Sequence, residues 1–171
     1  KFNFLSKRSL FMALSFSLPN YTSILVKGVD SEQLLQGQVS CDLSLNKGYF
    51  DGLFCDEKGY VITNAVIIKE DFFTIIVKKS VSKSLIKELE KFAKFYDCNI
   101  SEDDQNIYGI QEKNIFKKYV GENRSELTSS DWDIETMKNF CFDIEEQSSN
   151  KFRANELGYK FEDYISYDKG C

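Results

Sequence analysis

The chain has 171 residues, of which 42% are hydrophobic and 15% aromatic, so it is long enough to bury a core and is not disordered. Its 27 acidic residues outnumber 22 basic ones, and the net charge of -5 argues against nucleic-acid binding through overall charge. The sequence has no histidine, which excludes a serine or cysteine nucleophile activated by an imidazole.

The cysteines favour free thiols. There are five, an odd number, and they are widely spaced with no Cys-x-x-Cys pair: Cys41, Cys55, Cys98, Cys141 and Cys171. This spacing indicates neither a zinc site nor a disulfide framework, so we expect no metal and a cytoplasmic location. No apolar run reaches the roughly 20 residues that a membrane span needs, so no membrane association is expected.

The first elements in the chain are a strand over residues 21–27 and a short helix over residues 31–36 that Gly37 ends. Gln36 and Gln38 flank this glycine, and their amides both donate and accept hydrogen bonds. The chain reversal therefore places two adaptable polar groups beside an approachable backbone. The alternative is a polar helix end with no further role.

The central third of the sequence predicts an antiparallel meander of three strands over 49–55, 60–68 and 72–77. An amphipathic helix over 80–95 follows, with a solvated lysine face. The remaining elements are predicted as a short strand within 99–110 that follows Asp103-Asp104, a short helix over 114–120, a polar loop over 121–131 closed by Trp132, and a mixed helical pattern over 134–142.

The order of several short motifs carries a family resemblance. The last residues, Lys169-Gly170-Cys171 after Ile165-Ser166-Tyr167, match the start of a family signature. Upstream, the other motifs occur in the same order as in that family: Gly28-x-Asp30-Ser31, Leu35-Gln36-Gly37-Gln38 with Asp42, Cys55-Asp56-x-Lys58-Gly59, the helix from Ser80, the lone Trp132, and Glu156-Leu157. In this arrangement the chain resembles the YgfZ family of folate-binding proteins.

The resemblance implies an α+β domain like the amino-terminal part of the glycine-cleavage T-protein (GcvT), with an antiparallel meander and helices packed around a central cavity for tetrahydrofolate or another folate. It places the family's folate-contacting aromatic positions on Tyr21 and Trp132, where a pterin ring would find an aromatic face. Gln36 and Gln38 would add amide hydrogen bonds. It also implies a functional thiol at Cys171, with Gly170 in the motif and Lys169 to supply positive charge.

Members of the family support iron-sulfur enzymes, including the radical enzyme that methylthiolates tRNA, so such enzymes are the expected protein partners. The whole chain, residues 1–171, is expected to be one GcvT-like folate-binding domain. It begins without Met and stops inside the motif, which suggests a piece of a longer protein without the family's C-terminal barrel.

Two alternatives to a folate-binding factor remain open. A folate-dependent aminomethyltransferase of the T-protein type would carry adjacent aspartates where this chain has Thr63 and Asn64, and neither of these can act as a carboxylate base, so we do not expect an enzyme. A non-folate domain for RNA or protein interaction would use the basic residues of the chain. The candidates are Lys83, Lys87, Lys91, Lys94, Lys113, Lys117, Lys118 and Arg124. Direct nucleic-acid binding is not expected.

Overall fold

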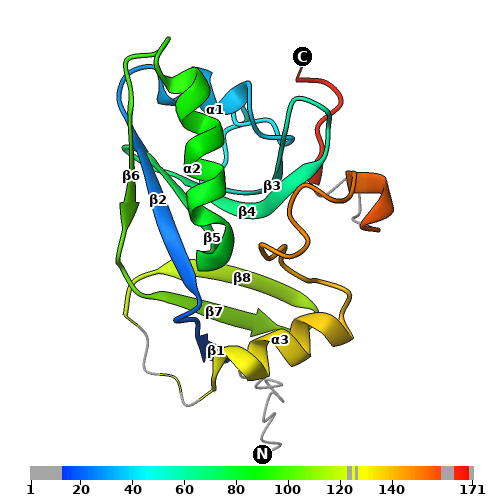
Figure 1. Ribbon diagram of the computed structural model, residues 1–171. Helices are drawn as coiled ribbons and strands as arrows, with labels where there is room; N and C mark the ends of the chain where they lie inside the picture. Colours follow the sequence, from blue (N-terminus) through cyan, green and yellow to red (C-terminus); the bar gives the residue numbers. More distant parts are fainter. Residues whose placement is uncertain (1–12, 123–124, 126, 159–163, 170–171) are drawn as a thin grey trace, which may run out of the picture.

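Two antiparallel sheets and three α-helices make up the computed structural model, which describes residues 13–122, 125, 127–158 and 164–169 (Figure 1). The five-stranded sheet has the order β3-β4-β5-β2-β6, and the three-stranded sheet has the order β1-β7-β8. The strands are β1 (Leu14–Ser17), β2 (Tyr21–Lys27), β3 (Tyr49–Cys55), β4 (Val61–Lys69), β5 (Phe73–Lys78), β6 (Asn99–Asp103), β7 (Ile107–Glu112) and β8 (Ile115–Val120). The helices are α1 (Ser31–Gln36), α2 (Lys79–Ala93), α3 (Ser129–Lys138) and the 3-10 turn η1 (Ala154–Glu156).

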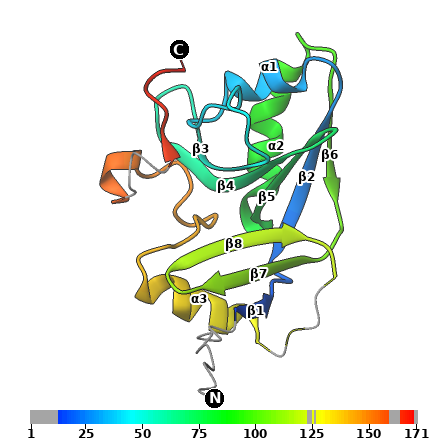
Figure 2. The ribbon, with the colours of Figure 1, turned by 180° about the vertical axis from the view of Figure 1, so that it is seen from behind.

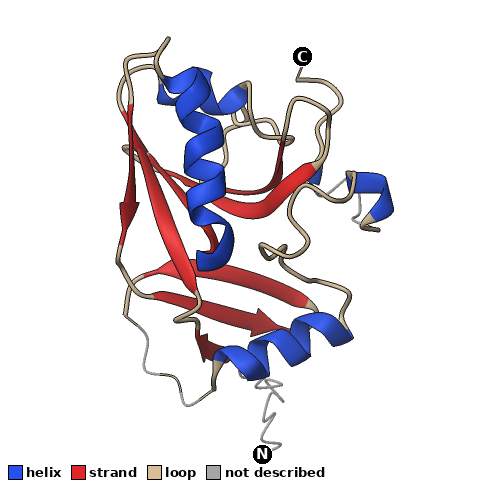
Figure 3. Ribbon diagram, in the orientation of Figure 1, coloured by secondary structure: helices blue, strands red, loops and turns tan. Residues whose placement is uncertain are grey.

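The predicted meander is confirmed as β3, β4 and β5, with each strand within a residue or two of its expected bounds. The turn between β3 and β4 forms because the Asp56 carboxylate accepts hydrogen bonds from the backbone N–H groups of Lys58 and Tyr60, both at 2.9 Å. The expected α+β class is also confirmed, since helices and antiparallel strands occupy separate layers (Figure 3).

Alternation along the strands divides the core into two parts. On one face of the five-stranded sheet, Ile75 and Val77 pack with Val81, Leu85 and Leu89 of α2, which confirms the amphipathic helix predicted over 80–95. On the other face, Ile76 packs with Trp132 and the residues around it. Helix α2 therefore covers one face of the sheet, and the unit formed from β1, β7, β8 and α3 packs at one end of it (Figures 1 and 2).

The region after Asn99 differs most from expectation. The short strand predicted within 99–110, after Asp103-Asp104, is present as β7, whereas β6 before it was not predicted and belongs to the other sheet. The helix predicted over 114–120 is wrong, because this segment is β8 and pairs with β7 in a hairpin. Lys113 has a φ of 57° at the turn, and the alternation of Phe116 and Lys118 with Lys117 and Tyr119 suits a strand.

Helix α3 begins earlier than the predicted 134–142 pattern. Thr128 forms a capping box with Asp131, so the helix starts at Ser129 and contains Trp132 rather than following it. Strand β1 was not predicted. None of the helices in the described part of the chain is long and apolar enough to cross a lipid bilayer.

Gly109 gives a test of this packing, because a methyl group added there would lie 2.4 Å from Cζ3 of Trp132. The ring has little room to move, since Phe16 and Phe116 contact it edge-on with centroids at 5.3 and 5.5 Å. Gly109→Ala is therefore expected to lower the free energy of unfolding by about 1–3 kcal/mol in urea denaturation.

The matched control is Gly37→Ala. An added methyl at Gly37 lies 3.6 Å from its nearest neighbour, and the backbone there is already in the right-handed helical region. This variant should change stability by less than about 1 kcal/mol. Equal losses for the two variants would contradict the packing described around Trp132.

Candidate functional site

A cleft of about 760 Å³ opens where the two sheets meet, and we take it as the candidate site. Strands β4 and β8, helix α3 and the segment that follows α3 all contribute to its walls. The lining mixes aromatic and apolar side chains with charged and amide groups, as small-molecule sites commonly do. The central cavity expected with this fold stays a prediction.

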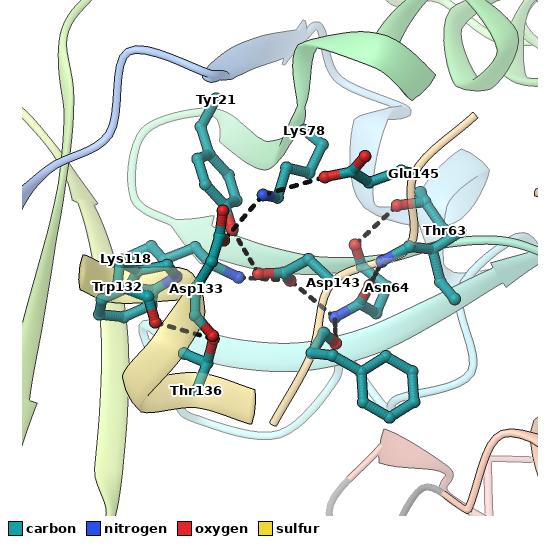
Figure 4. Close-up of polar contacts among 12 residues, drawn as sticks. Tyr21, Thr63, Asn64, Lys78, Lys118, Trp132, Asp133, Thr136, Asp143 and Glu145 are labelled. Atoms are coloured by element: carbon teal, nitrogen blue, oxygen red, sulfur yellow. Dashed lines mark hydrogen bonds and ion pairs between the residues drawn. The ribbon is translucent and has the colours of Figure 1, made fainter. Parts of the chain in front are cut away.

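Asp143 is the polar centre of this cleft, and Figure 4 shows the groups around it. Its side chain is 9% exposed and accepts hydrogen bonds from the Tyr21 hydroxyl at 2.5 Å, the Asn64 amide at 2.8 Å and the Lys118 ammonium at 2.6 Å. These donors lie on β2, β4 and β8, so a single carboxylate joins both sheets. Buried charges need such partners to remain in a folded protein.

The electrostatics keep Asp143 ionised. Burial raises the pKa of Asp143, but the charge and hydrogen bond of Lys118, the Tyr21 hydrogen bond and the charge of Lys78 outweigh burial and leave the pKa below its ordinary value. Burial and the adjacent Asp143 charge raise the pKa of Tyr21, so its hydroxyl stays protonated and donates.

Asn64 holds the Asp143 segment in place. Its Nδ2 donates to the backbone oxygen of Phe142 at 3.2 Å as well as to Asp143, and its Oδ1 accepts from the backbone N–H of Ile144 at 2.8 Å. Ile144 is buried with Leu53 and Val61, which anchors the end of this segment. The Asn64 side chain therefore links β4 to residues 142–144 through hydrogen bonds to each of the three residues.

Lys78 extends the charged network away from the cleft. It is 5% exposed and pairs with Asp133 at 3.0 Å and Glu145 at 3.3 Å. The Tyr21 ring lies between two ammonium groups, with Lys78 Nζ at 4.8 Å and Lys118 Nζ at 5.1 Å from its centroid. Both ammonium groups near the Tyr21 ring are thus neutralised, Lys78 by Asp133 and Glu145 and Lys118 by Asp143.

The predicted folate-contacting residues fall in different places. Trp132 lines the cleft but is only 1% exposed, with Gly109, Phe16 and Phe116 around its ring. Tyr21 is buried beside the cleft and reaches it through Asp143, and it also borders a separate pocket of about 390 Å³. Stacking of a pterin on either ring stays a prediction.

Gln36 and Gln38 do not line the cleft. The Gln36 side chain closes the loop after α1, donating to Asp42 at 2.8 Å and accepting from the Leu43 N–H at 2.8 Å. Helix α1 ends at Gly37 as expected. A role for these two amides in binding stays a prediction.

Residues 36–40, which include the Gln36-Gly37-Gln38 sequence, contact the last described residues of the chain. Lys169 Nζ donates to the carbonyl oxygen of Gln36 at 2.6 Å and to that of Val39. The Ser166 N–H donates to Ser40 at 2.9 Å, and the Ser40 hydroxyl donates to Tyr164. Segment 164–169 is thus tied to α1, and its Tyr164 borders the cleft.

Of the expected Lys-Gly-Cys motif, Gly170 and Cys171 lie outside the described residues, so the thiol stays a prediction. No disulfide joins the described cysteines, Cys41, Cys55, Cys98 and Cys141. Burial raises the pKa of the Cys41 thiol to about 11, although Lys169 opposes this shift, and burial likewise raises the pKa of Cys55 to about 11. These two thiols are poor nucleophiles near neutral pH. Within the described residues, no three His, Cys, Asp or Glu side chains are grouped to hold a metal.

Lys118 and Asp143 were not predicted as site residues. Lys118 was counted among the basic residues available to RNA, but it is 8% exposed and turned inward on β8. The available signal was its position in an alternating run, on the same side as Phe116. That signal was missed because residues 114–120 were predicted as a helix.

Comparisons with known proteins agree with this architecture. No family model matches the chain. A glycine cleavage system aminomethyltransferase T from Bartonella henselae superposes with a TM-score of 0.53 at 18% identity, covering 58% of this chain and 28% of that one. At this identity the likeness establishes the fold, so the chain has a GcvT-like fold.

Curated proteins that are similar in sequence identify the family resemblance more specifically than the fold does. The tRNA-modifying protein YgfZ of Enterobacter sp. (strain 638) is 32% identical over 114 residues, which are 62% of this chain and 35% of that protein. The tRNA-modifying protein YgfZ of Escherichia fergusonii is 32% identical over 94 residues, 53% of this chain and 29% of that protein. The resemblance predicted from the motifs is confirmed, since more than half of the chain is similar in sequence to YgfZ proteins. It spans about a third of the length of these curated relatives.

The Asp143 network predicts a distinct pH dependence. Because the folded-state pKa of Asp143 is lowered, its ion pair stabilises the fold above the ordinary carboxyl pKa of about 4 and is lost as pH falls through the lower folded value. Asp143→Asn should cost roughly 2–4 kcal/mol at pH 7, because it leaves Lys118 without its counter-charge.

The measurement is urea denaturation of wild type and variant from pH 7 down to pH 3. The stability difference should be largest near neutral pH and shrink below about pH 4, where Asp143 of the unfolded chain binds a proton before the folded carboxylate does. Asp104→Asn serves as the control, since Asp104 is exposed. A difference that stays constant or grows with acid would show that Asp143 is not held ionised by its partners.

Proposed function

We propose that this chain is a tetrahydrofolate-binding unit of a YgfZ-type factor, which supports iron-sulfur enzymes and thereby tRNA modification. The observation that carries the proposal is the cleft at the junction of the sheets. Its volume of about 760 Å³ falls within the range of about 300–1,000 Å³ typical of small-molecule sites. The sequence relatives, named as tRNA-modifying proteins, supply the wider role.

The cleft fits a folate chemically. A pterin is flat and has hydrogen-bonding groups along its edge, so it needs apolar contacts for its ring and a few fixed donors and acceptors. Phe116, Phe140 and Phe142 line the cleft, and Lys118 and Asp143 supply polar groups. The indole Nε1 of Trp132 is buried and makes no hydrogen bond among the described residues, although it is near enough to the Tyr21 hydroxyl to lower the pKa of that group.

The protein partners belong to the same proposal. Iron-sulfur enzymes, such as the one that methylthiolates tRNA, would be the clients, in the cytoplasm. Cys171 with Gly170 and Lys169 would be the functional thiol motif. Of these three residues, Lys169 is described, and its ammonium donates to the carbonyl oxygens of Gln36 and Val39 at the end of α1.

The aminomethyltransferase alternative gains a carboxylate from the structure, because Asp143 lies beside Asn64. However, a proton acceptor is most effective when its pKa is near the working pH, and the pKa of Asp143 is lowered by its ion pair. Its surroundings therefore favour fixed charge over proton transfer. This supports a binding factor rather than a transferase.

A titration tests the proposal. Tetrahydrofolate, added under reducing conditions, should quench the fluorescence of Trp132 in a saturable way, because this sole tryptophan lines the cleft. Isothermal calorimetry should give the same dissociation constant. Trp132→Phe should abolish the fluorescence change but retain calorimetric binding, since phenylalanine keeps an aromatic ring in the wall.

The control ligand is p-aminobenzoyl-glutamate, which lacks the pterin and should bind at least about tenfold more weakly if the ring supplies the main contacts. Absence of any calorimetric binding of tetrahydrofolate to the folded chain would overturn the proposal. Binding with unchanged Trp132 fluorescence would place the ligand away from this cleft and would also contradict it.

A further inference from the structure

Lys118 and Asp143 form a nearly buried ion pair that also lines the cleft. Their charged atoms are 2.6 Å apart, and their side chains are 11% and 9% exposed. They come from different parts of the fold, β8 and the segment after α3. The pair therefore presents a fixed donor beside a fixed acceptor, with no net charge, to anything that enters the cleft.

The neighbours of this ion pair do not use all of its hydrogen-bond donors and acceptors. An ammonium has three N–H donors, and among the described residues Lys118 Nζ hydrogen-bonds to Asp143 alone. The Tyr21 ring, at 5.1 Å, faces one further side of the ammonium. At least one Lys118 N–H is thus available.

Asp143 has a matching acceptor position. Its Oδ1 accepts from Asn64 and Lys118, whereas among the described residues its Oδ2 accepts from Tyr21 alone. Each carboxylate oxygen can accept about two hydrogen bonds, so Oδ2 has one position left. Buried polar groups are normally satisfied, which makes an available donor and acceptor on adjacent residues informative.

A second observation points to a ligand at the same place. Trp132 Nε1 is a buried donor with no hydrogen-bond partner among the described residues, and Trp132 also lines this cleft. An orphaned buried donor costs about 1–3 kcal/mol unless something satisfies it. The cleft therefore has spare polar capacity on Trp132 as well as on the Lys118–Asp143 pair, with the Tyr21 hydroxyl near both.

We infer that the Lys118–Asp143 pair recognises the edge of a planar heterocycle that carries a carbonyl oxygen next to a ring N–H. Lys118 donates to the carbonyl oxygen, and Asp143 Oδ2 accepts from the N–H. The inference rests on the proposed function, because the 4-oxo edge of a pterin has this pattern. An anionic edge such as phosphate fits less well, because Asp143 would repel it.

This assignment makes Lys118 and Asp143 determinants of specificity. Replacing the 4-oxo group of the ligand by an amino group would put a donor against the Lys118 ammonium and leave that charge unsatisfied. Sites built to hydrogen-bond a particular group reject analogues that lack it. The protein should therefore prefer tetrahydrofolate over its 4-amino analogue, tetrahydroaminopterin, by about tenfold or more.

Calorimetric titration of the 171-residue chain with these two ligands is the test, and the wild-type comparison needs no variant. The double variant Lys118→Met with Asp143→Asn removes both charges together, so that neither is left buried alone. It should bind the two ligands within about twofold of each other. Lys117→Met, on the exposed side of the same strand, is the matched control and should keep the wild-type preference.

The outcomes separate the two proposals. Equal affinity of the wild type for both ligands, or a preference for the 4-amino analogue, overturns the inference and leaves folate binding intact. A preference that persists in the folded double variant, or that Lys117→Met abolishes, also overturns it. Failure of the wild type to bind tetrahydrofolate at all overturns the proposed function, and the inference falls with it.

Discussion

The interaction on which the rest of the structure depends is the burial of the Asp143 carboxylate. An ionised carboxylate leaves water only when donors replace its hydration, and here Tyr21, Asn64 and Lys118 do so from three strands. Two of these strands belong to the five-stranded sheet and one to the three-stranded sheet. The need to satisfy one charge therefore fixes the contact between the sheets and the position of residues 142–144.

The cleft follows from this arrangement. Its polar wall is rigid because Asn64 uses both ends of its amide to hold the segment that carries Asp143. Its apolar wall comes from β8 and the residues that follow α3. A site with a paired, ionised carboxylate is suited to binding and orientation, whereas proton transfer calls for a carboxyl group whose pKa lies closer to neutrality. The site in this GcvT-like fold is thus better suited to holding a ligand in place than to moving protons.

The sequence predicted the parts of the fold that depend on local pattern. The meander was recognisable from alternation and from the Asp56 turn, and α2 from the stripe that includes Val81 and Leu85. Strand β8 was not, because six residues with mixed character fit a helical or an extended period equally well, and pairing with β7 decides between them. Because of this error, Lys118 was not recognised as a buried residue, since its burial depends on the strand. Asp143 was missed because its partners lie far away in the sequence, and only tertiary structure joins them. The order of motifs, in contrast, was sufficient to establish the YgfZ resemblance.

Hydrogen–deuterium exchange of the chain with and without saturating tetrahydrofolate is the most direct test of the central claim that the cleft around Asp143 is the binding site. We expect the ligand to slow exchange in residues 114–118 and 139–144, which contribute most of the residues that line the cleft. Slowing confined to residues 104–108 and 121–122, around the separate pocket near Pro19, would contradict that claim.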